Sequence, residues 1–427
     1  MTVVTEMPVA QVIDQMAAAA RKAGLQMARS SAAERSAALH AVADAIESES
    51  STIVAANALD LANADENGIT GAMRNRLELD AAGVAKLAAA VREVADQPDP
   101  LGGLEDEVER PNGLRVARMR IPLGVIAMIY ESRPNVTADA AALCLKAGNA
   151  VVLRGGSEAI HTNRAIAHAV GLGLSSSALP FEAVQLIPVT DREAIDVLLT
   201  KEDEVDLVIP RGGEGLIRAV TSKSRIPVLQ HYKGVCHVYV DESAPLERAS
   251  DIVHNAKVQR PGVCNAAETL LVHQGALELL PLIATRLVAD GVELRGCPRA
   301  VEALEAADVP VTAASDLDWS EEYLDLILSI RVVDDLEQAI DHVATYGSGH
   351  TEAIVTDDSA AADAFVAAIQ SSTVVVNAST RFADGGELGL GAEIGISTSK
   401  LHAYGPMGAN ELTTRKFVVV GEGQIRG

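Results

Sequence analysis

The chain has 427 residues and a formal net charge of −24, and 48% of its residues are hydrophobic although only 3% are aromatic. This length predicts two or three domains, with cores built mainly from aliphatic side chains. The negative charge argues against nonspecific nucleic-acid binding and against an anionic membrane surface. An anionic substrate would therefore require cations that are concentrated locally.

The sequence has no signal for membrane insertion or export. No apolar run reaches the roughly 18 residues of a bilayer span, and the N-terminal stretch MTVVTEMPVAQVIDQ has no basic region followed by an apolar one. The cysteines are far apart and include no Cys-x-x-Cys pair, so we expect no disulfide framework, no metal site and a cytoplasmic location. These cysteines are Cys144, Cys236, Cys264 and Cys297.

The first hundred residues have a helical pattern. Apolar residues at helical spacing predict helices over residues 12–28, 32–48 and 81–94. The Asn67-Gly68 pair predicts a break between the second and third of these helices, and prolines and glycines between residues 98 and 103 mark the end of the region.

From residue 125 onward, short apolar strands alternate with helices, which predicts parallel sheets covered on both faces. The glycine-rich segment 380–409 is too long for an idle loop and predicts a functional element. The first series has strands at 125–129, 150–153, 183–187, 205–209 and 235–240 and helices at 138–146, 163–174, 191–199 and 215–221. The second has helices at 249–257 and 276–290 and strands at 269–272, 327–332, 353–355 and 374–376.

Cys264 is the candidate nucleophile. It follows a Pro-Gly pair in the sequence VQRPGVCN, which predicts a turn between a helix and a strand. The neighbouring Arg260 and a candidate helix start favour the thiolate form, which is the reactive nucleophile. A buried, inert thiol is the commoner fate of a lone cysteine. The local sequence therefore leaves both interpretations open.

Polar residues follow three of the predicted strands. Asn135 lies after the strand 125–129, where its amide could donate to an oxyanion, although an ordinary helix N-cap is the simpler interpretation. The sequences RGGSE at 154–158 and PRGGEG at 210–215 suit a phosphate-bearing ligand at the carboxyl ends of strands. Neither is the G-x-G-x-x-G fingerprint, so a standard dinucleotide fold is not indicated.

Other candidate groups have an equally plain structural interpretation. Arg381 could anchor an anion or could be a surface cation. His231, His237 and His350 are potential acid–base groups, but a satisfied structural histidine is the simpler interpretation of each. Cys236 and His237 adjoin in a predicted strand and so point to opposite faces, which argues against a joint metal site.

Three long stretches carry a resemblance to a known family. They are IPLGVIAMIYESRPNVTADAAALCLKAGNAVVLRGGSEA, VQRPGVCNAAETLLVH and VNASTRFADGGELGLGAEIGISTSKLHAYGP, in this order. Over essentially its whole length the sequence resembles the gamma-glutamyl phosphate reductase family of proline biosynthesis, within the aldehyde dehydrogenase superfamily. The resemblance implies NADPH-dependent reduction of L-glutamate 5-phosphate to L-glutamate 5-semialdehyde, with release of phosphate, through a thioester on Cys264.

The resemblance also implies an aldehyde-dehydrogenase-like α/β fold with two parallel-sheet domains and a small oligomerisation segment. We expect a cofactor-binding domain at 1–232, a catalytic domain at 233–379, and a C-terminal segment at 380–427 with an active-site loop and an oligomerisation part. Residues 124–139 are also expected to contribute to oligomerisation. A homodimer or tetramer is expected, with functional coupling to glutamate 5-kinase and no nucleic-acid or membrane partner.

Site residues follow from the same resemblance. Cys264 falls on the nucleophile of the family and Asn135 on the oxyanion-stabilising asparagine of the superfamily. The candidate substrate-binding residues are Arg133, Arg260, Asn265, Ser379 and Arg381. The candidate cofactor-binding residues are Arg154, Gly155, Ser157, Gly212, Gly213 and Glu322.

Two departures from the family pattern matter. Residues 227–234 contain no carboxylate where oxidative relatives carry a glutamate base, which favours reduction of an acyl phosphate because phosphate leaves without such a base. Tyr404 replaces an arginine that many members carry. Three alternatives stay open: another acyl reductase of the superfamily, a cysteine hydrolase that pairs Cys264 with a histidine such as His350, and a non-catalytic α/β scaffold.

Overall fold

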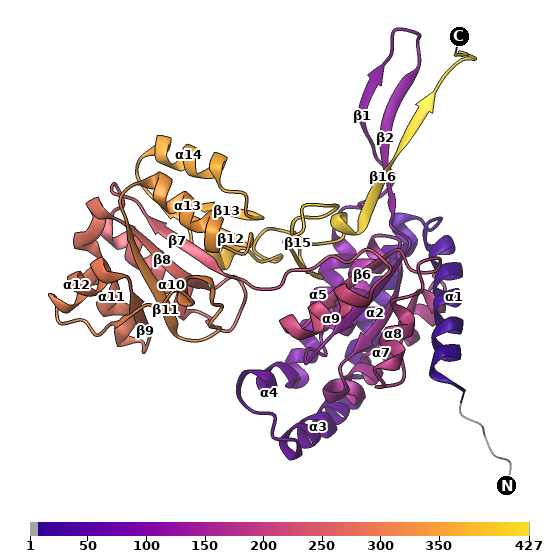
Figure 1. The fold of residues 1–427 in the computed structure, drawn as a ribbon. Coiled ribbons are helices and arrows are strands. Elements are labelled where there is room, and N and C mark those ends of the chain that lie inside the picture. The colour runs from indigo at the N-terminus through magenta and orange to yellow at the C-terminus, as the bar shows by residue number, and fades with distance from the viewer. Residues whose placement is uncertain (1–6, 427) are drawn as a thin grey trace. The chain divides into compact units, whose positions relative to one another are not determined.

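The computed structural model describes residues 7–426 and divides them into two compact units (Figure 1). Unit 1 contains residues 7–230, 389–395 and 407–426, and unit 2 contains residues 231–388 and 396–406. The C-terminal segment therefore supplies residues to both units. No helix among the described residues has the length and apolar composition needed to cross a membrane.

Unit 1 is rich in helices, and the three predicted over its first hundred residues are present. The second of them begins with a capping box, in which Ser31 and Glu34 satisfy each other's backbone N–H groups. The helices of unit 1 are α1 (Val9–Met27), α2 (Ala32–Ser48), α3 (Ser50–Glu66), α4 (Gly71–Leu77), α5 (Ala81–Asp96), α6 (Val136–Lys146), α7 (Ile160–Ser175), α8 (Glu193–Leu198) and α9 (Glu214–Lys223), with short 3-10 turns at Ser157–Ala159, Phe181–Ala183 and Asn410–Leu412.

A four-stranded parallel sheet lies at the core of unit 1. Its strand order is β5-β4-β3-β6, so the chain moves to the other side of β3 after β5. All residues of β3 and β4 are buried, which agrees with the apolar sequence VIAMIY of β3 and the apolar residues AVVL that begin β4. A crevice outside the carboxyl ends of such strands is the usual binding place in α/β sheets. The strands are β3 (Val125–Tyr130), β4 (Ala150–Gly155), β5 (Val184–Leu186) and β6 (Leu207–Arg211).

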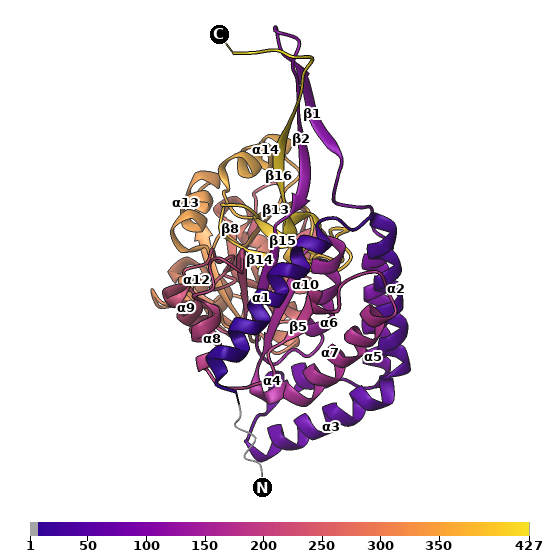
Figure 2. The same cartoon turned by 90° about the vertical axis from the view of Figure 1, so that its right-hand side faces the viewer.

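A three-stranded antiparallel ribbon, which the sequence did not predict, extends away from the helices of unit 1 (Figure 2). It consists of β1 (Leu104–Glu109), β2 (Arg115–Pro122) and β16 (Thr413–Val420) in the order β1-β2-β16. Charged and apolar residues mix along these strands, and only Ala117 and Thr413 are buried. β1 and β2 lack the apolar runs that revealed the other strands. The run FVVV of β16 is mostly exposed, and β16 pairs with a strand about 300 residues earlier in the chain.

Unit 2 contains a seven-stranded parallel sheet in the order β10-β9-β11-β8-β7-β12-β13. Apolar residues alternate between its faces: Val238 and Val240 of β7 pack with one group of helices, and Tyr239 packs with the other. Figure 1 shows these groups as α10–α12 and α13–α14. The strands are β7 (Cys236–Val240), β8 (Ala267–His273), β9 (Glu293–Gly296), β10 (Thr312–Ala313), β11 (Ile327–Val333), β12 (Thr351–Val355) and β13 (Thr373–Val376).

The assignment of strand 235–240 to the first series was wrong. This strand is β7, and it pairs with β8 and β12 inside the sheet of unit 2. The chain passes from α9 to β7 through a largely extended segment, which carries it out of the first sheet without a crossover helix. The helices of unit 2 are α10 (Leu246–Val258), α11 (Leu280–Ala289), α12 (Pro298–Glu305), α13 (Leu336–Tyr346) and α14 (Ser359–Ala368), with 3-10 turns at Gln274–Leu279, Asp318–Ser320 and Thr380–Phe382. A short two-stranded sheet, β14 (Gly395–Ser397) with β15 (Gly405–Met407), lies in the glycine-rich segment.

Candidate active site

Cys264 lies on a half-buried turn between α10 and β8, immediately before the amino end of β8. His231 precedes the amino end of β7, and His350 immediately precedes β12. Since β8, β7 and β12 are neighbouring parallel strands, their amino ends share one edge of the sheet. The candidate nucleophile of unit 2 is therefore at the amino edge of its sheet, whereas the phosphate-binding candidates of unit 1 follow the carboxyl ends.

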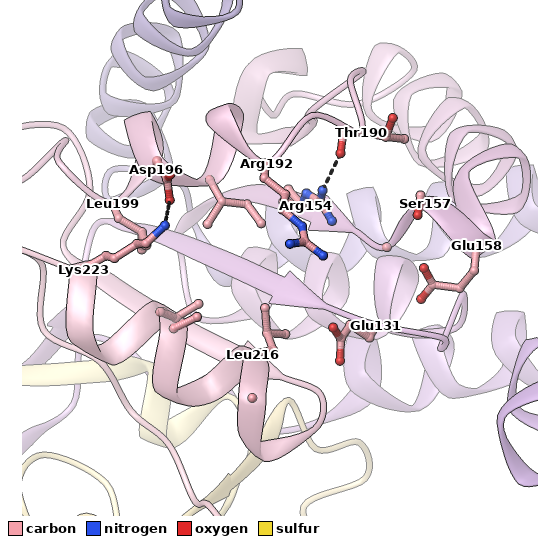
Figure 3. A pocket seen from close by; sticks show the side chains of 15 residues that line it. Glu131, Arg154, Ser157, Glu158, Thr190, Arg192, Asp196, Leu199, Leu216 and Lys223 are labelled. Atoms are coloured by element: carbon pink, nitrogen blue, oxygen red, sulfur yellow. Dashed lines mark hydrogen bonds and ion pairs between the residues drawn. The ribbon is translucent and has the colours of Figure 1, made fainter.

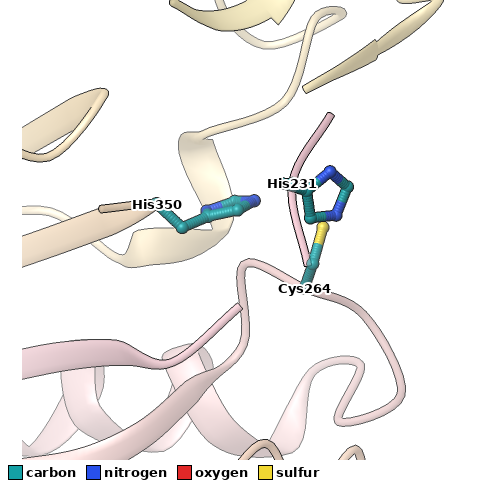
Figure 4. Close-up of side chains that lie close together, drawn as sticks. All are labelled: His231, Cys264 and His350. Carbon is teal, nitrogen blue, oxygen red and sulfur yellow. The ribbon is translucent and has the colours of Figure 1, made fainter. Parts of the chain in front are cut away.

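The two histidines lie beside the candidate nucleophile, as Figure 4 shows. The Cys264 Sγ and one ring nitrogen of each histidine all lie within 4.8 Å of one another. The rings of His231 and His350 are 5.6 Å apart between centroids, with an interplanar angle of 70°. The sequence favoured a structural role for both histidines, and only the tertiary fold shows that their loops lie next to the turn of Cys264.

His237 is the structural histidine that the sequence suggested. It is fully buried, and its Nδ1 lies 2.8 Å from a carboxylate oxygen of Glu352. Cys236, its neighbour in β7, places Sγ 3.2 Å from the backbone oxygen of Cys264 and 3.7 Å from Nδ1 of His350. The expectation that Cys236 and His237 point to opposite faces is confirmed.

Gly234 lets the backbone approach the turn of Cys264 closely. A Cβ atom at this position would lie 2.0 Å from the Cys264 backbone oxygen and 2.7 Å from its Cα. We predict that Gly234→Ala displaces the turn and lowers kcat by about 100-fold, the cost of a misplacement of about 1 Å. Steady-state kinetics test this, with Gly262→Ala as the matched control because its Cβ would meet only a backbone oxygen, at 3.7 Å. Equal activity of the two variants would contradict the prediction.

A buried ion pair joins the two ends of this turn. Lys257, at the end of α10, donates to Glu268, at the start of β8, over 2.6 Å, and both side chains are fully buried. Burial lowers the pKa of Lys257 and raises the pKa of Glu268 to about 7. Glu268 also accepts from the backbone N–H of Leu324. The sequence analysis missed this pair, although an ionisable residue inside each apolar segment was the available signal.

Four of the expected substrate-binding residues also belong to unit 2. Asn265 is buried and donates to Ala383 O over 3.0 Å, whereas its Oδ1 has no hydrogen-bond partner. Ser379 caps the turn Thr380–Phe382 by accepting from the N–H of Arg381. Burial lowers the pKa of Arg381, with a further electrostatic contribution from Arg260.

The same cations lie near the nucleophile. Arg381 is in electrostatic contact with Cys264 and donates to Gln259 over 2.8 Å. The exposed Arg260 completes this group, so positive charge is concentrated in one part of an acidic protein.

Glu322 also lies in this unit and accepts from the N–H of Gly234 over 2.8 Å. Tyr404 donates its hydroxyl to the backbone oxygen of Gln370. Arg133, the remaining substrate candidate, belongs to unit 1 and lies in the loop after β3.

A cavity of about 380 Å³ lies at the carboxyl ends of the strands of unit 1 (Figure 3). Two guanidinium groups contribute to it. Arg154 is buried and donates to the backbone oxygens of Gly155 and Thr190, while its Nε has no hydrogen-bond partner. Burial lowers the pKa of Arg154, and the charge of Arg192 lowers it further. Two neighbouring guanidiniums and an unsatisfied N–H fit an anionic group such as a phosphate.

Carboxylates occupy another part of the same cavity. Glu158 accepts from the N–H and hydroxyl of Ser132, and Glu131 accepts from the N–H of Gly213 over 3.2 Å. A Cβ atom on Gly212 would lie 2.3 Å from the Glu131 carboxylate, so the glycine leaves room for this side chain. Ser157 lines the cavity. Carboxylates suit sugar hydroxyls, and the N-terminus of α9 suits a phosphate, so the residues present fit a dinucleotide.

Asn135 is exposed in unit 1 at the start of α6. Its Nδ2 donates to an Asp139 oxygen over 2.8 Å, and no capping hydrogen bond is formed by its side chain. Burial raises the pKa of Asp139 to about 6, although the hydrogen bond from Asn135 opposes this shift. An amide nitrogen carries two hydrogens, so the bond to Asp139 orients the group and leaves one donor.

Comparison with known proteins agrees with this geometry. Residues 2–290 match the aldehyde dehydrogenase family. The chain is 56% identical to the gamma-glutamyl phosphate reductase of Nitratidesulfovibrio vulgaris, over 98% of this chain and 100% of the relative.

Solved structures give the same result. The crystal structure of the gamma-glutamyl phosphate reductase of Thermotoga maritima has a TM-score of 0.94 and 42% identity, over 97% of this chain and 100% of that one. The enzyme of the same name from Saccharomyces cerevisiae has a TM-score of 0.54 and 31% identity, over 97% and 98% of the two chains. The chain therefore belongs to the aldehyde dehydrogenase family and, within it, to the gamma-glutamyl phosphate reductases.

Proposed function

We propose that the protein reduces L-glutamate 5-phosphate to L-glutamate 5-semialdehyde and inorganic phosphate with NADPH, as a step of proline biosynthesis. The observation that carries this proposal is the thiol of Cys264 on a turn beside two imidazoles, within a chain of the gamma-glutamyl phosphate reductase family. A thiol is the group that can accept an acyl chain from an acyl phosphate and hold it as a thioester.

The reaction begins when the Cys264 sulfur attacks the 5-carbonyl carbon. A ring nitrogen of His231 and one of His350 lie within 4.8 Å of the Cys264 sulfur, and these imidazoles are the candidates to accept the thiol proton. The carbon–sulfur bond forms, the bond to phosphate breaks, and phosphate leaves with the electron pair. The family resemblance assigns the role of oxyanion donor in this step to Asn135. When bound, NADPH would supply the hydride. Cys264 would hold the thioester and then the thiohemiacetal, whose collapse would release the aldehyde and restore the thiol.

The substrate carries a phosphate, an α-carboxylate and an α-ammonium group. Arg260 and Arg381 are the candidates in unit 2 for its anionic groups, with Arg133 as the candidate in unit 1. The partnerless Oδ1 of the buried Asn265 is suited to accept a hydrogen bond from the ammonium group. Ser379 holds the backbone of the turn that carries Arg381.

We assign the cavity of unit 1 to the adenosine half of NADPH. Arg154 and Arg192 would hold the 2′-phosphate, Glu158 a ribose hydroxyl, and the N-terminus of α9 the pyrophosphate. The loops around this cavity contain the remaining cofactor-binding candidates, Gly155, Ser157, Gly212 and Gly213. Glu322 stays the candidate for the nicotinamide ribose. Four free thiols, one of them nucleophilic, suit the reducing cytoplasm.

The preference for NADPH over NADH tests this assignment. Arg192→Ala is expected to raise the KM for NADPH by about 10- to 100-fold, the value of one charge-assisted hydrogen bond, while the KM for NADH changes little. Lys223→Ala is the matched control, because Lys223 lines the same cavity but is already paired with Asp196 over 2.7 Å. If Arg192→Ala raises the KM for NADPH and the KM for NADH by the same factor, Arg192 does not contact the 2′-phosphate.

We further propose that the three-stranded ribbon joins copies of this chain into a homodimer or tetramer. The segment 124–139 was expected to contribute to oligomerisation, but its strand β3 (Val125–Tyr130) is buried inside unit 1. We therefore assign the contact between copies to the ribbon, which includes the C-terminal strand β16. The ribbon exposes apolar side chains that a second copy would cover. These are Leu104, Val108, Phe417, Val419 and Val420.

Disruption of this apolar surface tests the assembly. Phe417 is 65% exposed, and Phe417→Asp is expected to shift the protein toward monomer in sedimentation experiments, because it would bury a charge at the interface. Leu282→Asp, at an exposed site on α11, is the control and should leave the mass unchanged. An oligomer that persists in Phe417→Asp would argue against the ribbon as the contact between copies.

Coupling to glutamate 5-kinase would appear as faster product formation in a mixture with the kinase than independent turnover allows.

The direct test of function uses the reverse reaction. Purified protein, glutamate 5-semialdehyde, NADP and phosphate should yield NADPH in a phosphate-dependent manner. A cysteine hydrolase is the competing function, since Cys264 and His350 also have the geometry of a thiol–imidazole pair. A hydrolase would consume acyl substrates without nicotinamide. No NADPH from folded protein, together with cofactor-independent hydrolysis, would replace the proposed function by that alternative.

A further inference from the structure

Three potential metal ligands converge at the nucleophile of unit 2. We name His231, Cys264 and His350 the thiol–imidazole cluster. Their ligand atoms all lie within 4.8 Å of one another (Figure 4). In a tetrahedral zinc site with bonds of about 2.0–2.3 Å, ligand atoms are roughly 3.3–3.8 Å apart. The cluster is therefore within small side-chain rotations of a three-ligand site.

Hydrogen bonds orient both imidazoles for such a role. The Nδ1 of His231 lies 2.9 Å from Ile396 O, and a carbonyl oxygen only accepts, so Nδ1 is the donor and Nε2 is the ring nitrogen left for a metal ion. The Nδ1 of His350 is engaged by the Thr351 hydroxyl at 2.8 Å. Figure 4 shows the ring of His350 directed toward His231 and Cys264. Such partners at the second ring nitrogen are typical of metal-binding histidines.

We propose that the thiol–imidazole cluster is a reversible inhibitory site for zinc. Two imidazoles and a thiol are borderline-soft ligands, which favour Zn²⁺ over Mg²⁺ or Ca²⁺. On binding, the Cys264 thiol releases its proton to solvent and the sulfur electron pair forms the bond to zinc. Since the same electron pair attacks the substrate, bound zinc and the formation of the acyl-enzyme exclude each other.

The surroundings of the cluster suit a reversible ion better than a permanent one. Cys264 and His231 are only half-buried, so solvent can supply the fourth ligand and a chelator can reach the ion. Arg381 is in electrostatic contact with Cys264 and opposes a dication there. The site therefore differs from a closed structural zinc site, in which four protein ligands surround the ion.

Cobalt(II) is the probe for ligand identity. The full-length protein, kept reduced with a non-thiol reductant, is titrated with Co²⁺ and its absorption spectrum is recorded. A thiolate-to-cobalt charge-transfer band with intense visible bands of a four-coordinate ion is expected at one equivalent, and Zn²⁺ should displace it. Absence of the charge-transfer band would overturn the proposal, because Cys264 would then not be a ligand.

Variants separate the three ligands from other thiols. Cys264→Ser should abolish the charge-transfer band, and His231→Asn or His350→Asn should weaken Zn²⁺ binding at least about 10-fold. Cys297→Ser is the matched control, because it removes another half-buried thiol outside the cluster and should leave binding unchanged. Unchanged affinity in both histidine variants would overturn the proposal. Circular dichroism of each variant verifies that it is folded.

Two further measurements complete the test: the protection of Cys264 from alkylation by Zn²⁺, and the inhibition of reductase activity by Zn²⁺. Zn²⁺ should block the alkylation of Cys264 by iodoacetamide, as peptide mass mapping shows, and a chelator should restore it. The inhibitory role depends on the proposed function, so reductase activity is measured separately and should fall with zinc occupancy. A protein that binds zinc at the cluster but is no reductase would refute the proposed function alone. A reductase whose Cys264 is neither bound nor protected by zinc would refute the zinc site alone.

Discussion

Cys264→Ala is expected to lower kcat for phosphate-dependent NADPH formation by at least about 10⁴-fold, since loss of a covalent nucleophile removes the whole acyl-enzyme route. The turn of Cys264 is fixed by the Lys257–Glu268 ion pair and by the close approach of Gly234 to the Cys264 backbone, and neither involves the sulfur that is removed. The variant should therefore remain folded. The measurement is the initial rate with saturating glutamate 5-semialdehyde, NADP and phosphate.

A control variant and a labelling experiment test whether Cys264 is the nucleophile. Cys297→Ser is the control, because it removes a half-buried thiol that accepts a hydrogen bond from Val332 and should retain nearly full activity. Isotopically labelled acyl phosphate should label the wild-type protein on Cys264 in the absence of NADPH, and should not label Cys264→Ala. Labelling at another cysteine, or substantial activity of Cys264→Ala, would contradict the assignment of the nucleophile.

Asn135→Ala has the second largest expected effect, a decrease in kcat of about 10²–10³-fold with little change in KM. This is the typical cost of one oxyanion donor, because the donor acts on charge that develops only in the transition state. Asn135 is exposed and makes no capping bond, so its loss should leave the thermal stability of α6 nearly unchanged. A normal kcat in Asn135→Ala would contradict the role of oxyanion donor and would leave Asn135 as an ordinary residue at the start of α6.

Asp139 adds a pH dependence to this prediction. Its pKa of about 6 lies above the ordinary value because the carboxyl is buried, so a proton binds as the pH falls below about 6. Protonation weakens the acceptor that orients the Asn135 amide, and kcat should fall on this acid side. Asp139→Asn keeps an oxygen acceptor but cannot titrate, so its kcat should lose this part of the pH profile. An identical profile in both proteins would exclude Asp139 as the positioning residue.

The long apolar strands and amphipathic helices could be predicted from sequence, because their side-chain period is visible in a short window. The ribbon was missed because β1 and β16 are mostly exposed, β2 is mostly half-buried, and the pairing of β16 with β2 joins distant segments. The same limitation misplaced β7, since apolar composition predicts a strand but not the sheet that it joins.

The candidate site divides in the same way. The sequence by itself determined the family, and through that resemblance it proposed Cys264 as the nucleophile, because the family pattern is encoded in contiguous residues such as VQRPGVCN. Only the tertiary structure decided that His231 and His350 accompany Cys264, that Lys257 pairs with Glu268, and that Arg192 adjoins Arg154. The physical reason is that parallel strands align loops that are up to about a hundred residues apart at one edge of a sheet, and no local pattern records which loops will meet.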